Sequence, residues 1–313
     1  MLSARDAAGA LARGFAQAGV EADELPLADG GDGTAEVLYA ALGGEWGEAE
    51  VSDPFGRRVA ARFLVLPDGR AVVEAAQTIG LARIAPGELD PVAASSRGLG
   101  ELILAAGPHA RELLVALGGS ATVDGGAGLR EVLVELPLPT TVACDVANPL
   151  LGERGAARTF GPQKGATAEQ VEELEARLGA MEELRPAADL AGAGAAGGLG
   201  AALAVLGARL VPGAELVLEA LGFRERIRGA AVVVTGEGVV DRTSGEGKAP
   251  GVVLRICREE GVRCVVFGGR IVEPLAGAEH EELSGDPTRA RDDLVALGER
   301  LGLGLTGAVA PGA

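Results

Sequence analysis

Residues 112–128 read ELLVALGGSATVDGGAG, and this stretch decides the fold class. The apolar run 112–117 is typical of a strand buried on both faces, and a glycine-rich loop follows it directly. Residues 100–106 before it have helical spacing, and a second apolar run follows at 140–144. Strands that alternate with helices predict a parallel sheet covered by helices. The sequence therefore predicts an α/β protein.

The same alternation returns near the C-terminus. Short apolar runs at 230–234 and 264–267 flank a helical pattern at 250–259, which predicts two more parallel strands. Between the N-terminal helix, capped by Ser3, and the middle of the chain, the pattern predicts a strand meander over residues 51–75.

These patterns predict two α/β domains. We expect a discontinuous outer domain formed by residues 1–45 and 225–313, and a second domain inserted at residues 46–224.

Composition and charge exclude several classes of partner. The formal net charge is −17, so the chain repels nucleic acid and anionic lipid surfaces. No run of 18 apolar residues is present, and charges interrupt the N-terminal segment where a signal peptide would be apolar. Three cysteines without CxxC spacing indicate reduced structural thiols. We expect a cytoplasmic protein with small-molecule partners.

The rarity of lysine in this sequence points to two candidate functional residues. Of the 28 basic residues only Lys164 and Lys248 are lysines, and glycine flanks each within the segments GPQKGA and GEGKAP. A compact ammonium group in a confined loop suits a phosphate contact that a planar guanidinium does not replace. We expect both lysines to be functional.

Several familiar signatures fail. A Walker A loop would need glycine in place of Arg242 and a hydroxyl residue in place of Ala249. A GxGxxG match at 192–197 lacks a preceding strand, so helix packing explains it better than dinucleotide binding by an oxidoreductase. With His109 and His280 as the only histidines, serine hydrolase chemistry is disfavoured.

The remaining candidates are lysines, aspartates and the amides of three glycine loops, each expected to follow a strand: ADGGDGT, GGSATVDGG and TGEGVVDRTSGEGK. Phosphoryl transfer requires this set, because carboxylates hold Mg²⁺ while amides and ammonium groups meet the charge on the phosphoryl group. The sequence therefore predicts a kinase.

Eight collinear motifs resemble the bacterial type I glycerate kinases over residues 3–270. They read LADGGDGT, DPFGR, SSRGLGELI, LGGSATVDGGAG, ACDVANPLLG, FGPQKGA, GAGAAGGLG and TGEGVVD with a later GK. The resemblance implies phosphorylation of D-glycerate, in the usual assignment at the 2-hydroxyl, with ATP and Mg²⁺ as cofactors. It also implies a flavodoxin-like outer domain and an active site in the cleft between the two domains.

Matched motif by motif, the resemblance implies a set of site residues. The catalytic residues are Lys248, Asp241 and Asp29; the substrate- and phosphate-binding residues are Gly30, Gly31, Gly118, Gly119, Ser120, Thr122, Asp124, Gln163, Lys164, Gly236, Glu237 and Gly238; the metal ligands are Asp145 and Asp241.

One departure leaves an alternative open. The family begins with a strand ending in Asp-Ser-Phe-Lys-Gly, and this sequence starts just after the corresponding position. We therefore expect either that the start of the sequence is placed too late or that the outer domain lacks its first strand. In the second case a catalytically impaired, ligand-binding relic of the fold is the alternative to an active kinase. The oligomeric state and the choice between 2- and 3-phosphoglycerate stay open.

Overall fold

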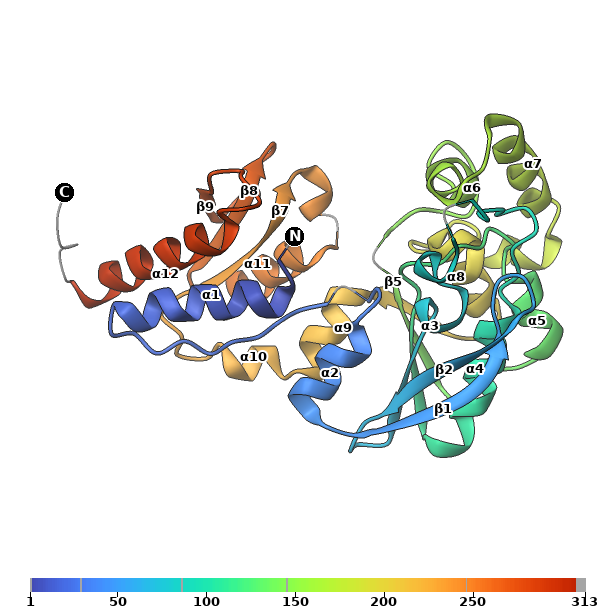
Figure 1. Cartoon of the computed structure of the whole chain (residues 1–313), viewed down its shortest axis with the longest axis horizontal. Coiled ribbons are helices and arrows are strands. Elements are labelled where there is room, and N and C mark those ends of the chain that lie inside the picture. Colours follow the sequence, from blue (N-terminus) through green and yellow to red (C-terminus); the bar gives the residue numbers. More distant parts are fainter. Residues whose placement is uncertain (1, 29, 86, 145, 246, 308–313) are drawn as a thin grey trace. The chain divides into compact units, whose positions relative to one another are not determined.

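The chain divides into two compact units (Figure 1). One unit is formed by Met1–Ala28 with Gly222–Ala313, and the other by Asp29–Leu221. We call them the split unit and the central unit. The structure is a computed structural model, and it describes residues 2–28, 30–85, 87–144, 146–245 and 247–307.

The division places helix α2 (Thr34–Leu42) in the central unit, whereas the sequence placed residues 1–45 in the outer domain. The reason is packing: α2 contacts strands β2 and β3 and helix α9, and its Leu38 is fully buried. At the other end, the division falls at 221/222 and the sequence-based boundary at 224/225.

A six-stranded sheet forms the centre of the central unit, in the order β1-β2-β3-β4-β5-β6. The meander of the first three strands is antiparallel, and β3 to β6 are parallel, so this part of the predicted α/β pattern is confirmed. The strands are β1 (Glu45–Ser52), β2 (Arg58–Val65), β3 (Arg70–Glu74), β4 (Glu112–Ala116), β5 (Thr140–Cys144) and β6 (Arg209–Pro212).

Strand β4 is buried on both faces, as its unbroken apolar run predicts. Leu113 and Val115 share a core with Leu99 of α4 (Arg97–Ala106), while Leu114, only 4% exposed, points to the opposite face. Each such side chain contributes about 1.5–3 kcal/mol on burial. The parallel arrangement brings the carboxyl ends of β3, β4 and β5, and the loops after them, to one edge of the sheet.

Helices pack against this sheet, among them α2 and α4. The remaining α-helices described in the central unit are α3 (Ala76–Ile79), α5 (Ala127–Val132), α6 (Ala156–Phe160), α7 (Ala168–Gly179), α8 (Ala195–Val205) and α9 (Gly213–Ala220). The GxGxxG match at residues 192–197 overlaps the start of helix α8, which is kinked at residues 196–198. At Gly197 a Cβ atom would lie 2.1 Å from the Thr122 carbonyl oxygen. The glycine thus allows α8 to pack against the loop after β4, which is the packing role expected from the sequence.

The split unit contains a three-stranded parallel sheet in the order β7-β8-β9. Its strands are β7 (Val233–Val240), β8 (Cys264–Ile271) and β9 (Glu279–Glu282), and its helices are α1 (Ala4–Gln17), α10 (Phe223–Arg226), α11 (Ala249–Glu260) and α12 (Ala290–Thr306). Helices α1 and α12 pack closely because Gly14 faces the Val295 carbonyl, where a Cβ atom would be 2.0 Å away. Ser3 caps α1, as predicted.

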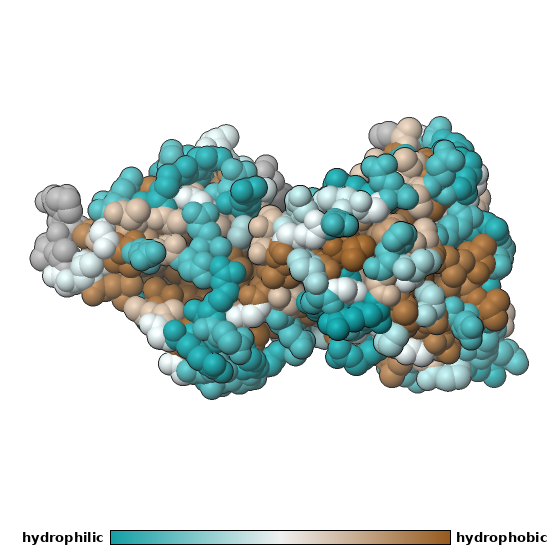
Figure 2. All heavy atoms as spheres, turned by 90° about the horizontal axis from the view of Figure 1, so that it is seen from below, coloured by the Kyte–Doolittle hydropathy of each residue, from teal (hydrophilic) through white to brown (hydrophobic). Residues whose placement is uncertain are grey.

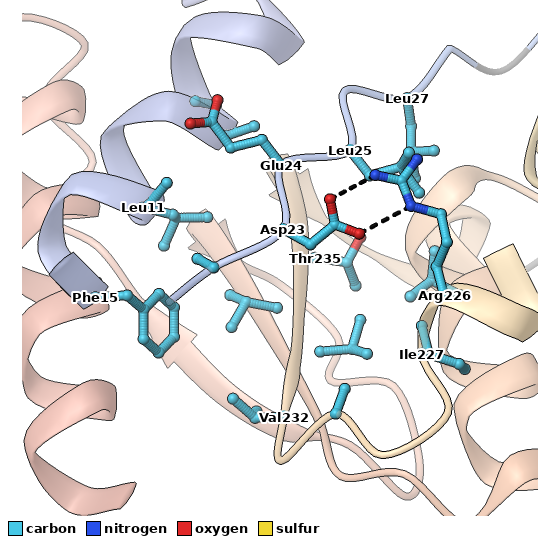
Figure 3. Close-up of a pocket in the computed structure, with 18 of the residues that line it drawn as sticks. Leu11, Phe15, Asp23, Glu24, Leu25, Leu27, Arg226, Ile227, Val232 and Thr235 are labelled. Carbon is cyan, nitrogen blue, oxygen red and sulfur yellow. Dashed lines mark hydrogen bonds and ion pairs between the residues drawn. The ribbon is translucent and has the colours of Figure 1, made fainter. Parts of the chain in front are cut away.

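A groove of about 420 Å³ lies beside β7, the edge strand of this sheet (Figure 3). Apolar side chains of α1, including Leu11 and Phe15, form one wall, and residues 20–27 cross it without regular structure. The strand expected before the ADGGDGT loop is therefore absent from the described chain. Arg226 of α10 pairs with Asp23 at 2.5 Å. These contacts hold the connecting segment over the groove.

On the face shown in Figure 2, hydrophilic residues cover large areas of each unit, and hydrophobic residues gather in smaller patches. Among the described residues, no helix combines the length and the apolar character needed to span a bilayer. Cys144, Cys257 and Cys264 are buried, and none of the three is part of a disulfide bond.

Candidate active site

Two segments that are distant in sequence form a small cavity in the central unit. Gly118, Gly119 and Ser120 follow β4, and Gln163 and Lys164 lie on the short turn after α6. The cavity has a volume of about 80 Å³. Five of the sequence-predicted residues therefore meet at one place.

Lys164 is the charged residue among the described residues that line this cavity, and it is only 3% exposed. Its Nζ donates to Ser120 Oγ at 3.0 Å and to the Thr122 carbonyl oxygen at 2.7 Å. Burying an ammonium group is costly unless its donors are satisfied, so these bonds fix its position. A fixed positive charge beside glycine amides is suited to an anionic ligand.

Asp124, predicted as a binding residue, is buried away from the cavity lining. Its carboxylate accepts from the backbone N–H and hydroxyl of Ser96, at 2.8 and 2.7 Å, and from the N–H groups of Gly126 and Gly128, both at 3.1 Å. Four donors satisfy most of its acceptor capacity. Asp124 thus shapes the loop. Thr122 is fully buried as well, and its Oγ1 has no hydrogen-bond partner among the described residues.

The predicted acidic glycine loop packs directly on this turn. The Gly118 N–H donates to the Gly30 carbonyl at 3.3 Å, and a Cβ atom at Gly118 would lie 2.4 Å from Gly31 Cα. Gly30 has a φ of 89°, which favours glycine. The loop is closed by Thr34, whose hydroxyl donates to the Gly31 carbonyl at 2.7 Å. Asp29, predicted as catalytic, lies outside the described residues.

The first part of the third glycine motif, residues 235–240, is strand rather than loop, which corrects that part of the sequence-based prediction. Gly236, Glu237 and Gly238 lie within β7, which extends to Val240 because it pairs with β8 along its whole length. At Gly236 a Cβ atom would lie 2.2 Å from the Phe267 carbonyl oxygen. Here glycine is required by strand packing.

The other predicted lysine, Lys248, directly precedes α11 and approaches a side chain of β7. Lys248 Nζ lies 3.7 Å from Glu237 Oε2, and Glu237 Oε1 is buried without a hydrogen-bond partner among the described residues. Asp241 follows the strand directly and turns the chain, since its N–H donates to Ser244 Oγ at 2.9 Å. The predicted residues thus form two groups, one in each unit.

Mg²⁺ was expected at Asp145 and Asp241. Asp145 lies outside the described residues, and the described ones contain no group of three or more His, Cys, Asp or Glu side chains that could hold a metal. Mg²⁺ commonly uses one or two carboxylates together with substrate phosphates. Asp241 and the unpartnered Glu237 oxygen are compatible with that mode.

Sequence reasoning missed the apolar walls of the cavity and one buried acid. The walls are formed by Leu81, Leu117, Val146, Phe160 and Ala196. Phe160 could have been found from its place in the FGPQK motif. The acid is Glu74, at the end of β3, and a lone carboxyl group in the apolar run AVVEAA was the available signal.

Comparisons with known proteins agree with this arrangement. The family model of the glycerate kinase family matches residues 1–135 and 136–285. A glycerate 2-kinase of Escherichia coli (strain K12) is 36% identical, with 90% of this chain and 84% of that protein covered. A glycerate kinase of Halalkalibacterium halodurans is 37% identical, with 86% and 82% covered.

A solved structure gives the same result. A crystal structure named for glycerate kinase 2 from Salmonella typhimurium LT2 superposes with a TM-score of 0.81 at 32% identity, covering 98% of this chain and 95% of that chain. The sequence matches extend over most of the chain, and the structural match reaches both units. The chain belongs to the glycerate kinase family.

Proposed function

We propose that this protein is a glycerate kinase that transfers the γ-phosphoryl group of ATP to the 2-hydroxyl of D-glycerate. The observation that carries the proposal is the cavity at Lys164 and Ser120, in a chain whose relatives are named glycerate kinases. At about 10–15 Å³ per water-sized group, its volume of about 80 Å³ accommodates a small organic acid.

In the reaction, the bond between the γ-phosphorus and the ADP oxygen breaks, and a bond from phosphorus to the glycerate hydroxyl oxygen forms. The hydroxyl proton passes to a carboxylate base, for which the sequence offers Asp29. Lys164 and the amide of Gly119 would bind the anionic acid. Lys248 would meet the charge of the phosphates, because a mobile ammonium group suits that task. Catalysis in such reactions is largely positioning and charge stabilisation.

Mg²⁺, as part of the same proposal, would be held by Asp241 and the nucleotide phosphates, and would neutralise charge on the phosphoryl group. Asp29 and Asp145 stay candidates from the sequence. The protein would work in the cytoplasm on small molecules, since a net charge of −17 disfavours nucleic acid and anionic membranes.

A coupled ADP-release assay with D-glycerate and Mg-ATP tests the proposal, and phosphorus NMR of the product identifies the phosphorylated hydroxyl. We expect glycerate-dependent turnover that falls at least about 100-fold in Lys248→Ala. Arg255→Ala is the matched control, because Arg255 lies on the same helix α11 and pairs with Glu259 on its surface at 3.0 Å. Absence of turnover in the wild type, with glycerate binding retained, would instead support the ligand-binding relic.

A further inference from the structure

Glu74 is a buried carboxyl group that the proposed reaction does not use. It is the last residue of β3 and is only 2% exposed. Its Oε1 accepts from the Ala35 N–H at 3.2 Å, while its Oε2 is buried and has no hydrogen-bond partner in the part of the chain that the structure describes. Among the described residues, no Lys, Arg or His forms an ion pair with it. A buried acid in this state is expensive to keep ionised.

The position of Glu74 connects it to the cavity. Ala35 lies in the first turn of α2, where backbone N–H groups lack partners within the helix, so the Glu74 carboxyl group supplies one from outside. Helix α2 begins directly after the loop of residues 30–34, and that loop packs against Gly118. Moving α2 would therefore move the loop that supports the glycine turn.

A second path runs through the sheet. Glu74 pairs with Ala116 of β4, and the Ala75 N–H donates to the Ala116 carbonyl at 2.8 Å. The Gly118-Gly119 turn of the cavity follows two residues after Ala116. The carboxyl group thus lies beside the strand end from which the turn emerges.

The surroundings favour a neutral carboxyl group. Burial, together with the nearby charges of Glu36 and Asp32, raises the pKa of Glu74 to about 7, and the backbone hydrogen bonds of Ala35 and Thr34 oppose this rise. Of the other charged groups on neighbouring elements, Arg62 of β2 pairs with Glu36, and Glu112 lies at the opposite end of β4. Helix α9, which contacts α2, adds Glu215 and Glu219. The carboxyl group of Glu74 therefore gains or loses its proton near neutral pH.

We propose that Glu74 is a positioning residue that couples proton binding to binding of the anionic substrate in the cavity. This inference rests on the proposed function for its substrate. The neutral carboxyl group holds α2 and the loop 30–34 in place without adding negative charge beside the site. Ionised Glu74 repels the substrate anion, so substrate affinity falls as the proton is lost.

Steady-state kinetics at saturating Mg-ATP test the coupling. Because glycerate is fully ionised from pH 6 to 8.5, a change of its KM in this range reports the protein. We expect the wild-type KM for glycerate to rise about five- to tenfold across the range. In Glu74→Gln, which keeps Oε1 and stays neutral, KM should stay near the low-pH value. Glu48→Gln, which removes an exposed carboxylate of the same sheet, is the control and should follow the wild type.

Amide hydrogen exchange tests the positioning separately and needs no catalysis. The Ala35 amide should be protected in the wild type and in Glu74→Gln, and should lose that protection in Glu74→Ala while the rest of α2 keeps it. Parallel KM profiles in Glu74→Gln and the wild type, or a protected Ala35 amide in Glu74→Ala, would overturn the inference. A wild type that exchanges as expected but does not phosphorylate glycerate would overturn the proposed function instead.

Discussion

Replacing Glu74 with glutamine should make the central unit more stable at high pH and leave it nearly unchanged at low pH. The side chain keeps its size and the acceptor for the Ala35 N–H, and loses only the ability to ionise. Because burial raises the pKa of Glu74, the folded wild type holds its proton more tightly than the unfolded chain does. This stabilisation is complete below the unfolded pKa and is lost as the pH rises through the folded pKa.

The magnitude follows from the two pKa values. The ordinary value of 4.5 and the folded value of about 7 differ by an amount that corresponds to about 3 kcal/mol at 1.36 kcal/mol per pH unit. Between pH 5.5 and pH 8.5 the wild type should lose about 2 kcal/mol of that. The glutamine variant has no proton to lose, so the difference in the free energy of unfolding should grow by the same amount.

Urea unfolding at the two pH values measures this difference. Trp46, the single tryptophan of the chain, lies on β1, so its fluorescence reports the central unit alone. Glu48→Gln on the same strand is the control for general effects of net charge. The reasoning would be refuted if Glu74→Gln and the wild type differed in free energy of unfolding by the same amount at both pH values, within about 0.5 kcal/mol. That result would mean that Glu74 does not titrate in this range.

Substitutions at three further residues test the site. Lys164→Met should lower glycerate-dependent turnover, measured by ADP release, at least about 100-fold. Lys164→Arg should be almost as slow, because Lys164 is only 3% exposed and its ammonium group donates to Ser120 and to the Thr122 carbonyl, a geometry that a guanidinium does not reproduce. Asp124→Asn should cost about 3 kcal/mol in the unfolding of the central unit, since four donors lose a charged acceptor. Gly118→Ala should raise the KM for glycerate several-fold, because its Cβ atom would meet Gly31 Cα at 2.4 Å; an unchanged KM would show that the two loops separate freely.

Much of the fold could be predicted because local signals agreed with the tertiary structure. The apolar run before Gly118 could only be a strand buried on both faces, and the caps and spacing of the first helix were unambiguous. Helix α12 was missed, although it packs along α1 through Gly14 and Gly298. Its contacts are between residues nearly 300 positions apart, which local periodicity does not encode.

The sequence indicated which types of residue belong to the candidate site, but it was less informative about the role of each residue. Lys164 was found because its rarity in an arginine-rich chain set it apart, and the structure places it in the cavity lining. Asp124 has the same polarity and lies close in sequence to Ser120, yet its oxygens are used by Ser96 and two backbone amides. Whether a polar side chain is hydrogen-bonded within the protein or is available to a ligand depends on the partners that the fold places beside it. Such partners can be distant in sequence, as Ser96 is from Asp124.

The glycines show why contacts between distant segments matter when a function is assigned from a sequence motif. Gly118, Gly197 and Gly236 all belong to motifs that resemble phosphate cradles, but at each of them a Cβ atom would come within 2.4 Å of another backbone segment. The Gly118 amide is also used by the Gly30 carbonyl. Glycine is therefore required at these positions by the approach of one chain segment to another, whether or not a ligand is bound. A glycine-rich motif becomes informative about ligand binding only when a charged side chain, as with Lys164, is fixed beside it.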